Sequence, residues 1–138
     1  MAVELGVAEK VIFTGMVPPT QVQKYYQLGD VFVAASTSET QGLTFIEAAA
    51  NGLPLLCRAD PCLDGVLAPG ENGAVYADEA EFQTGLCSLL SDSVSLQAAG
   101  RRSRQIARRF GTRAFGEAVE KIYLEVLAER TVREDVFI

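Results

Sequence analysis

The stretch VFVAASTSETQGLTFIEAAANGLPLLCRA, residues 31–59, contains two apolar runs separated by a polar loop and an alanine-rich segment. The runs at 31–36 and 53–59 are continuous apolar segments, as in strands buried on both faces. Between them, TFIEAAAN at 44–51 predicts a short helix that Gly52 ends. Because a strand, a helix and a second strand in this order form a right-handed crossover between parallel strands, the stretch predicts an α/β fold.

The same alternation extends in both directions from this unit. Upstream, VIFTG at 11–15 predicts a short strand, and the prolines after it open a helix, QVQKYYQL. Downstream, GAVYA at 73–77 predicts a last strand, and three helices follow it. The expected architecture is a Rossmann-like parallel sheet with helices on both faces, formed by residues 1–130 and followed by a tail at 131–138. The apolar positions that define the helices are Val22, Tyr25 and Tyr26; Phe82, Leu86, Leu89 and Leu90; Ala99, Ile106 and Phe110; and Phe115, Val119, Ile122, Tyr123, Val126 and Leu127.

The composition excludes several classes of function. The chain has 138 residues and no histidine, so it cannot by itself form a Ser-His-Asp or Cys-His catalytic centre or a histidine-ligated zinc site. Its net charge of -6 argues against a nucleic-acid binder. Cys57, Cys62 and Cys87 have no metal-binding spacing, so we expect reduced thiols in the core and no metal site.

Two further features concern location. The start, MAVELGVAEK, has neither the basic residues nor the apolar segment of a secretory signal, and we therefore expect a cytoplasmic protein. Six of the twelve basic residues lie between Arg101 and Arg113. This cluster is either a solvated helix face or a surface that contacts an anionic membrane from the cytoplasmic side, and nucleic acid is the remote alternative.

The residues from Glu39 to Glu47 follow a strand, at the sheet edge where ligands bind in such folds. Two interpretations of Glu47 are open. In one, Thr44 and Glu47 form a capping box, and Glu39 is a solvated loop residue. In the other, Gly42 begins a helix whose N–H groups bind a diphosphate, and Glu47 accepts hydrogen bonds from the hydroxyls of a ribose beside it.

The pattern S-x-x-E-x-x-G-x-x-x-x-E-A-x-A-x-G-x-P at residues 36–54 resembles the donor-site signature of family 4 retaining glycosyltransferases, which have the GT-B fold. The sequences VIFTGMVPPTQVQKYYQLGDVFVAAS, GVLAPGENGAVY and IARRFGTRAFGEAVEKIYLEVL are also similar to the family, so the resemblance covers residues 11–129. ETQGLTFIEA and CRADPCLDGV resemble a subgroup that acts on diacylglycerol. The resemblance implies part of the C-terminal donor-binding domain of a GT-B fold, and it favours the second interpretation of Glu47.

The resemblance also implies a reaction and a role for each site residue. The parent protein is expected to be a hexosyltransferase that moves a sugar from a nucleotide sugar, such as a UDP-hexose, to an acceptor, with retention and without a metal. Glu47 is expected to bind the ribose hydroxyls, and Glu39 to act as the catalytic residue at the sugar. The remaining implied donor contacts are Gln41, Gly42, Leu43 and Thr44 at the diphosphate, and Gly15, Met16 and Val17 at the nucleobase.

The sequence departs from the family pattern in three places. Gln41 stands where the family commonly has Phe. The family's Arg and Lys pair at the diphosphate is missing, and Arg58 is either a partial replacement for it or an ordinary surface arginine. The N-terminal acceptor domain is missing too. The resemblance therefore implies the last portion of a longer enzyme, inactive alone, whose partner is the missing domain.

An alternative from another class of function also fits these departures. The chain is then a non-catalytic partner subunit or interaction module, completed by a separate acceptor-domain protein. A fragment lacking neighbouring strands is expected to have an open sheet edge and an exposed apolar surface, which favour self-association.

Overall fold

The computed structural model describes residues 1–38 and 42–135. Most predicted elements are present, with boundaries shifted by a few residues. In chain order the helices and strands are the 3-10 helix η1 (Ala8–Lys10), α1 (Pro19–Tyr26), β1 (Phe32–Ala34), α2 (Leu43–Ala50), β2 (Leu55–Arg58), the 3-10 helix η2 (Pro61–Leu63), β3 (Gly73–Tyr76), α3 (Glu79–Leu90), α4 (Ser93–Ala107), the 3-10 helix η3 (Arg108–Phe110) and α5 (Thr112–Asp135).

The three strands form one parallel sheet in the order β1-β2-β3. Phe32 is paired with Leu55, and Leu55 with Gly73, so the amino-terminal ends of the strands are aligned. All three carboxyl ends consequently meet at one edge of the sheet. The prediction of a parallel α/β sheet is confirmed.

Helices cover both faces of β2. Leu55 and Cys57 point to the face that is packed by α2, where they join Phe45 in the main hydrophobic core. Leu56 points to the opposite face, toward Gly85 of α3. The first three side chains of β2, Leu55, Leu56 and Cys57, are fully buried, which explains the continuous apolar run in the sequence.

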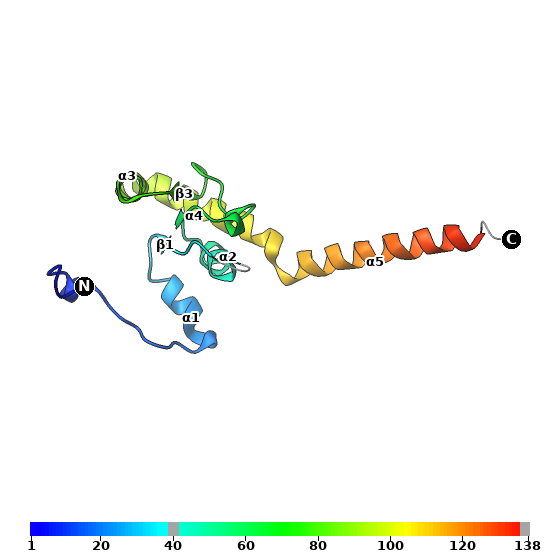
Figure 1. The fold of residues 1–138 in the computed structure, drawn as a ribbon, viewed down its shortest axis with the longest axis horizontal. Helices are drawn as coiled ribbons and strands as arrows, with labels where there is room; N and C mark the ends of the chain where they lie inside the picture. The colour runs from blue at the N-terminus through cyan, green and yellow to red at the C-terminus, as the bar shows by residue number, and fades with distance from the viewer. Residues whose placement is uncertain (39–41, 136–138) are drawn as a thin grey trace.

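The predicted strand at 11–15 is wrong. These residues lead into α1 without pairing with the sheet, and the N-terminal segment lies apart from it (Figure 1). Ile12 and Phe13 are 88% and 83% exposed. A β-rich sequence needs a neighbouring strand to supply its hydrogen bonds, and β1 and these residues do not meet.

Helix α5 extends away from the sheet and its helices (Figure 1). Its predicted apolar positions include Phe115, Ile122 and Tyr123, which are all exposed. The periodicity therefore predicted the helix correctly, but not its burial. Helix α5 continues to Asp135 and so includes the first five residues of the predicted tail.

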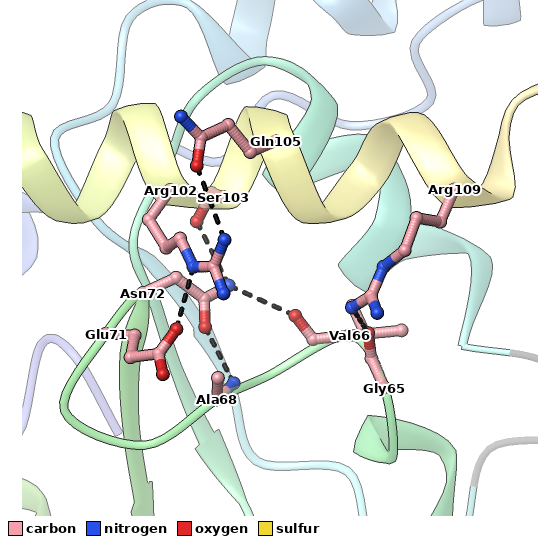
Figure 2. A network of polar contacts seen from close by, with 9 residues as sticks. All are labelled: Gly65, Val66, Ala68, Glu71, Asn72, Arg102, Ser103, Gln105 and Arg109. Atoms are coloured by element: carbon pink, nitrogen blue, oxygen red, sulfur yellow. Dashed lines mark hydrogen bonds and ion pairs between the residues drawn. The ribbon is translucent and has the colours of Figure 1, made fainter.

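Asn72 joins the turn before β3 to helix α4 (Figure 2). This side chain is fully buried. Its Oδ1 accepts a hydrogen bond from the Ala68 N–H at 2.7 Å, and its Nδ2 donates to Val66 O at 3.1 Å and to Ser103 Oγ at 3.3 Å. Because every polar atom of the amide has a partner, its burial is compatible with a stable core.

Arginines of the basic cluster make structural contacts with neighbouring loops. Arg104 Nη2 donates to the Asn51 O at the end of α2 at 3.0 Å, and Arg109 Nη2 donates to Gly65 O at 3.1 Å. Arg102 forms an ion pair with Glu71 at 2.7 Å (Figure 2). The basic cluster is therefore not only a solvated helix face, since its arginines on α4 and η3 also hold neighbouring loops in place.

The three cysteines are free thiols in different environments. Cys57 is buried, Cys62 is half-buried and Cys87 is exposed, so the expectation of core thiols holds for Cys57 but is wrong for Cys87. Burial raises the pKa of the Cys57 thiol to about 12. No helix within residues 1–38 and 42–135 is both long and apolar enough to cross a bilayer.

Candidate functional site

The candidate site begins where the carboxyl ends of the strands lie together. β1 ends at Ala34, and the Tyr76 hydroxyl, at the end of β3, donates a hydrogen bond to Ala34 O at 3.0 Å. This hydrogen bond joins the carboxyl ends of β1 and β3, the two strands on either side of β2. The loop from β1 to α2 and the loop that follows β2 both leave from this edge.

Gly42 starts helix α2 in the left-handed conformation, with a φ of 59°. It is buried, and a Cβ here would lie 2.9 Å from Phe45 Cδ2 and 3.2 Å from Cys62 Cβ. Only glycine combines this backbone conformation with so close a contact. Gly42 therefore lets the start of α2 lie against η2, the first element after β2.

Gly42 is the N-cap of α2, and no side chain of residues 1–38 and 42–135 caps the helix. The Phe45 and Ile46 N–H groups donate to Gly42 O, so the N–H groups of Leu43 and Thr44 precede the first helical hydrogen bonds. The capping-box interpretation is wrong, because Thr44 is the second residue of the helix instead of its cap. Leu43 and Thr44 are both exposed at this helix start.

The Glu47 carboxylate has a different partner, Tyr26 at the end of α1. The Tyr26 hydroxyl donates to Glu47 Oε2 at 3.0 Å. Partial burial of Tyr26, followed by its hydrogen bond to Glu47 and the charge of that carboxylate, raises the pKa of the phenol to about 12. The phenol therefore remains a hydrogen-bond donor throughout the neutral pH range.

Glu47 and Tyr26 lie at a pocket of about 310 Å³ between α1 and α2. Its size is at the lower end for small-molecule sites. A cavity of about 500 Å³ lies between β3, α3 and α4, and none of the predicted site residues that the structure describes lines it. The residues that line the smaller pocket are Pro19, Val22, Gln23, Tyr26, Glu47, Ala50 and Asn51.

The structure gathers only some of the predicted site residues. Gly15 has a φ of 64° and Met16 is fully exposed in the segment before α1. Val17 follows Met16 directly, and Pro19, which lines the pocket, comes two residues after Val17. Arg58 is exposed at the end of β2. Of the predicted site residues that the structure describes, Glu47 lines the pocket, and the others do not: Gly15, Met16, Val17, Gly42, Leu43, Thr44 and Arg58. The predicted positions Glu39 and Gln41 lie outside the described residues.

Sequence reasoning assigned no site role to Tyr26 or Asn51. Tyr26 was expected only as one of the apolar positions of its helix, and it does lie half-buried against the Phe32 ring, with centroids 6.0 Å apart. Asn51 Nδ2 donates to the main-chain oxygen of Glu47 at 2.9 Å. Both contacts depend on how the helices meet, although helical spacing already placed Asn51 one turn after Glu47.

The described part of the chain has no group of three or more cysteine, aspartate or glutamate side chains placed to hold a metal ion. The polar groups at the pocket are a carboxylate, a phenol and side-chain amides. Such groups recognise hydroxyls by hydrogen bonding.

Sequence comparison relates the chain to sugar-transferring enzymes. The family model described as "Glycosyl transferases group 1" matches residues 1–106. The chain is 30% identical over 135 residues to an alpha-monoglucosyldiacylglycerol synthase of Streptococcus pneumoniae (strain ATCC BAA-255 / R6), and the alignment covers 98% of this chain and 30% of that protein. It is 32% identical over 121 residues to a protein of the same name from Acholeplasma laidlawii, and this alignment covers 87% of this chain and 30% of that protein. The chain thus spans less than a third of these relatives.

Solved structures share the fold. A sucrose-phosphate synthase from Thermosynechococcus elongatus superposes with a TM-score of 0.79 at 23% identity, covering 93% of this chain and 33% of that one. The pneumococcal O-GlcNAc transferase GtfA, in complex with UDP and GlcNAc, gives a TM-score of 0.76 at 26% identity and covers 91% and 26%. Together with the family match, these likenesses show that the chain belongs to the glycosyl transferases group 1 family and corresponds to a C-terminal part of the GT-B fold.

Proposed function

We propose that this chain is the donor-binding portion of a retaining hexosyltransferase whose donor is a nucleotide sugar, most simply a UDP-hexose. The observation that carries the proposal is the Glu47 carboxylate, which lies at a pocket and one turn from the helix start at Gly42. A carboxylate beside a set of main-chain N–H groups suits a ribose joined to a diphosphate. The UDP in the complex of a structural relative supports the choice of base.

The proposal gives each residue of the donor site a role. Glu47 accepts hydrogen bonds from the ribose hydroxyls, and Glu39 contacts the transferred sugar near its anomeric carbon. The diphosphate lies at the start of α2, where the helix dipole favours an anion. Gln41, Gly42, Leu43 and Thr44 contact the diphosphate and the sugar, Arg58 contributes positive charge to the diphosphate, and Gly15, Met16 and Val17 contact the base.

These 138 residues span 30% of the length of the relatives they match, and we expect them by themselves to bind the donor without transferring the sugar. Each cation of the Arg and Lys pair in the family pattern is worth about 1.5 to 3 kcal/mol, and this pair is not among the 138 residues, so we expect binding to be weak. We expect a dissociation constant of about 1 mM, which corresponds to about -4 kcal/mol.

The test is an NMR titration of the labelled chain with UDP, GDP and ADP. We expect one nucleotide to shift the amide signals of residues 15–17 and 42–47, and we expect Glu47→Ala to abolish these shifts. Glu120→Ala, an exposed glutamate on α5, is the matched control and should leave them unchanged. Unchanged amide signals at residues 42–47 with about 10 mM of every nucleotide would rule out the donor site.

The acceptor is a lipid in this proposal, because two relatives are named monoglucosyldiacylglycerol synthases. The protein then works at the cytoplasmic face of a membrane. Arg101 and Arg108 are exposed and are available for anionic headgroups, at about 1 kcal/mol for each residue. Vesicles containing an anionic lipid should co-sediment the chain at low salt, and reversing both charges should reduce the bound fraction. Equal binding to neutral vesicles would count against electrostatic contact.

A further inference from the structure

We propose that Tyr26 is a positioning residue for Glu47: its hydroxyl fixes one carboxylate oxygen so that the carboxylate is held ready for ribose hydroxyls. This inference rests on the proposed function. It adds a residue from a different helix to the donor site, and the role proposed for this residue is exerted through its hydrogen bond to Glu47.

The hydrogen bond joins two separate helices. Tyr26 is the last residue of α1, Glu47 lies in the second turn of α2, and the donor and acceptor oxygens are 3.0 Å apart. A glutamate at an exposed position otherwise samples many side-chain conformations. Because the acceptor is ionised, this hydrogen bond is stronger than one between neutral groups. It therefore restricts the carboxylate before any ligand arrives.

The Tyr26 ring is itself held by packing. Its centroid lies 6.0 Å from that of Phe32, and the Phe32 centroid lies 6.2 Å from that of Phe45. Phe45 is 1% exposed and belongs to the main core. This series of aromatic contacts connects the phenol to the main hydrophobic core. A support of this kind is what a preorganised site needs.

The hydrogen bond leaves the carboxylate able to bind ligand hydroxyls. Tyr26 occupies one of about four lone-pair positions on the two oxygens. Both side chains line the same pocket, so the carboxylate is held at its wall. The two adjacent hydroxyls of a ribose match the acceptors that remain.

A purely structural role for Tyr26 predicts a different outcome. If the phenol only tied α1 to α2, its removal would affect every ligand of the site equally. If it positions Glu47, its removal affects only ligands that carry the ribose hydroxyls. The contrast between UDP and 2′,3′-dideoxy-UDP therefore separates the two roles.

The experiment measures the affinities of the 138-residue chain for UDP and 2′,3′-dideoxy-UDP, by amide shifts, in the native protein, Tyr26→Phe and Glu47→Gln. We expect Tyr26→Phe to weaken UDP binding about five- to tenfold and dideoxy-UDP binding less than twofold. Tyr25→Phe removes the hydroxyl of the preceding, exposed tyrosine and is the matched control. It should change neither affinity.

Two results would overturn the inference alone. In the first, Tyr26→Phe weakens the binding of both nucleotides equally. In the second, Tyr26→Phe weakens the binding of neither. In both cases Glu47→Gln still removes the preference for UDP over the dideoxy form. Failure of the native chain to bind UDP, or a preference for UDP that survives in Glu47→Gln, would instead overturn the proposed function and this inference with it.

Discussion

At the scale of single residues, Gly42 shows how one position serves both the backbone and the packing. A Cβ at this position would be strained by the φ of 59° and would lie too close to Phe45 and Cys62. We expect Gly42→Ala to lower the free energy of unfolding by about 2 to 4 kcal/mol, because left-handed strain and overpacking add together. Urea unfolding measures this change.

Gly70→Ala is the control for Gly42→Ala. Gly70 also has a positive φ, 79°, but a Cβ there would meet no atom within 4 Å. This substitution should cost only the strain, about 1 to 2 kcal/mol. Equal losses for the two variants would mean that the contact with η2 contributes nothing.

Cys57 and Tyr26 make the free energy of unfolding vary with pH in the alkaline range. Their pKa values are raised from 9.0 and 10.0 to about 12 in the folded chain. The folded state therefore holds these protons when the unfolded state has lost them, and stability decreases as pH rises from about 9 toward 12. Urea midpoints between pH 8 and 11 should show this decrease. Tyr26→Phe should make the decrease smaller, whereas Tyr25→Phe should not.

At the scale of elements, helix α4 depends on one buried amide more than on its surface ion pair. Asn72→Ala leaves the Ala68 N–H and Val66 O without their present partners inside the protein. We expect a loss of about 3 kcal/mol in the free energy of unfolding. Arg102→Ala removes an exposed ion pair with Glu71 and should cost at most about 1 kcal/mol. The reverse order in urea unfolding would contradict this account of α4.

The elements also show which features a sequence can predict. Helix α2 and strand β2 were predicted because local signals, Gly52 and a continuous apolar run, agree with the burial of β2. The segment at 11–15 has an equally good β pattern but lacks a partner strand. Spacing predicted Glu47 as a site residue, but not its bond to Tyr26, which depends on the packing of α1 beside α2. Local pattern is therefore sufficient only where local and tertiary preferences agree.

At the scale of the whole molecule, apolar surface is left uncovered. Ile122, Tyr123 and Val126 on α5 are all more than half exposed, although their spacing is typical of a buried helix face. Exposed apolar side chains that share one helix face are typical of surfaces that associate. The sequence predicted self-association from a missing part of the sheet, and α5 provides a second surface for it.

We therefore expect the isolated chain to self-associate in a concentration-dependent way, as measured by sedimentation equilibrium. Burying one isoleucine contributes about 1.5 to 3 kcal/mol, so Ile122→Lys should raise the dissociation constant about tenfold or more. Val94→Lys is the matched control, because Val94 is 69% exposed at the start of α4, away from α5's apolar positions. If both variants associate like the native chain, the contact lies elsewhere, and the unpaired edge of β1 becomes the surface to test, since a parallel neighbour there would extend the sheet.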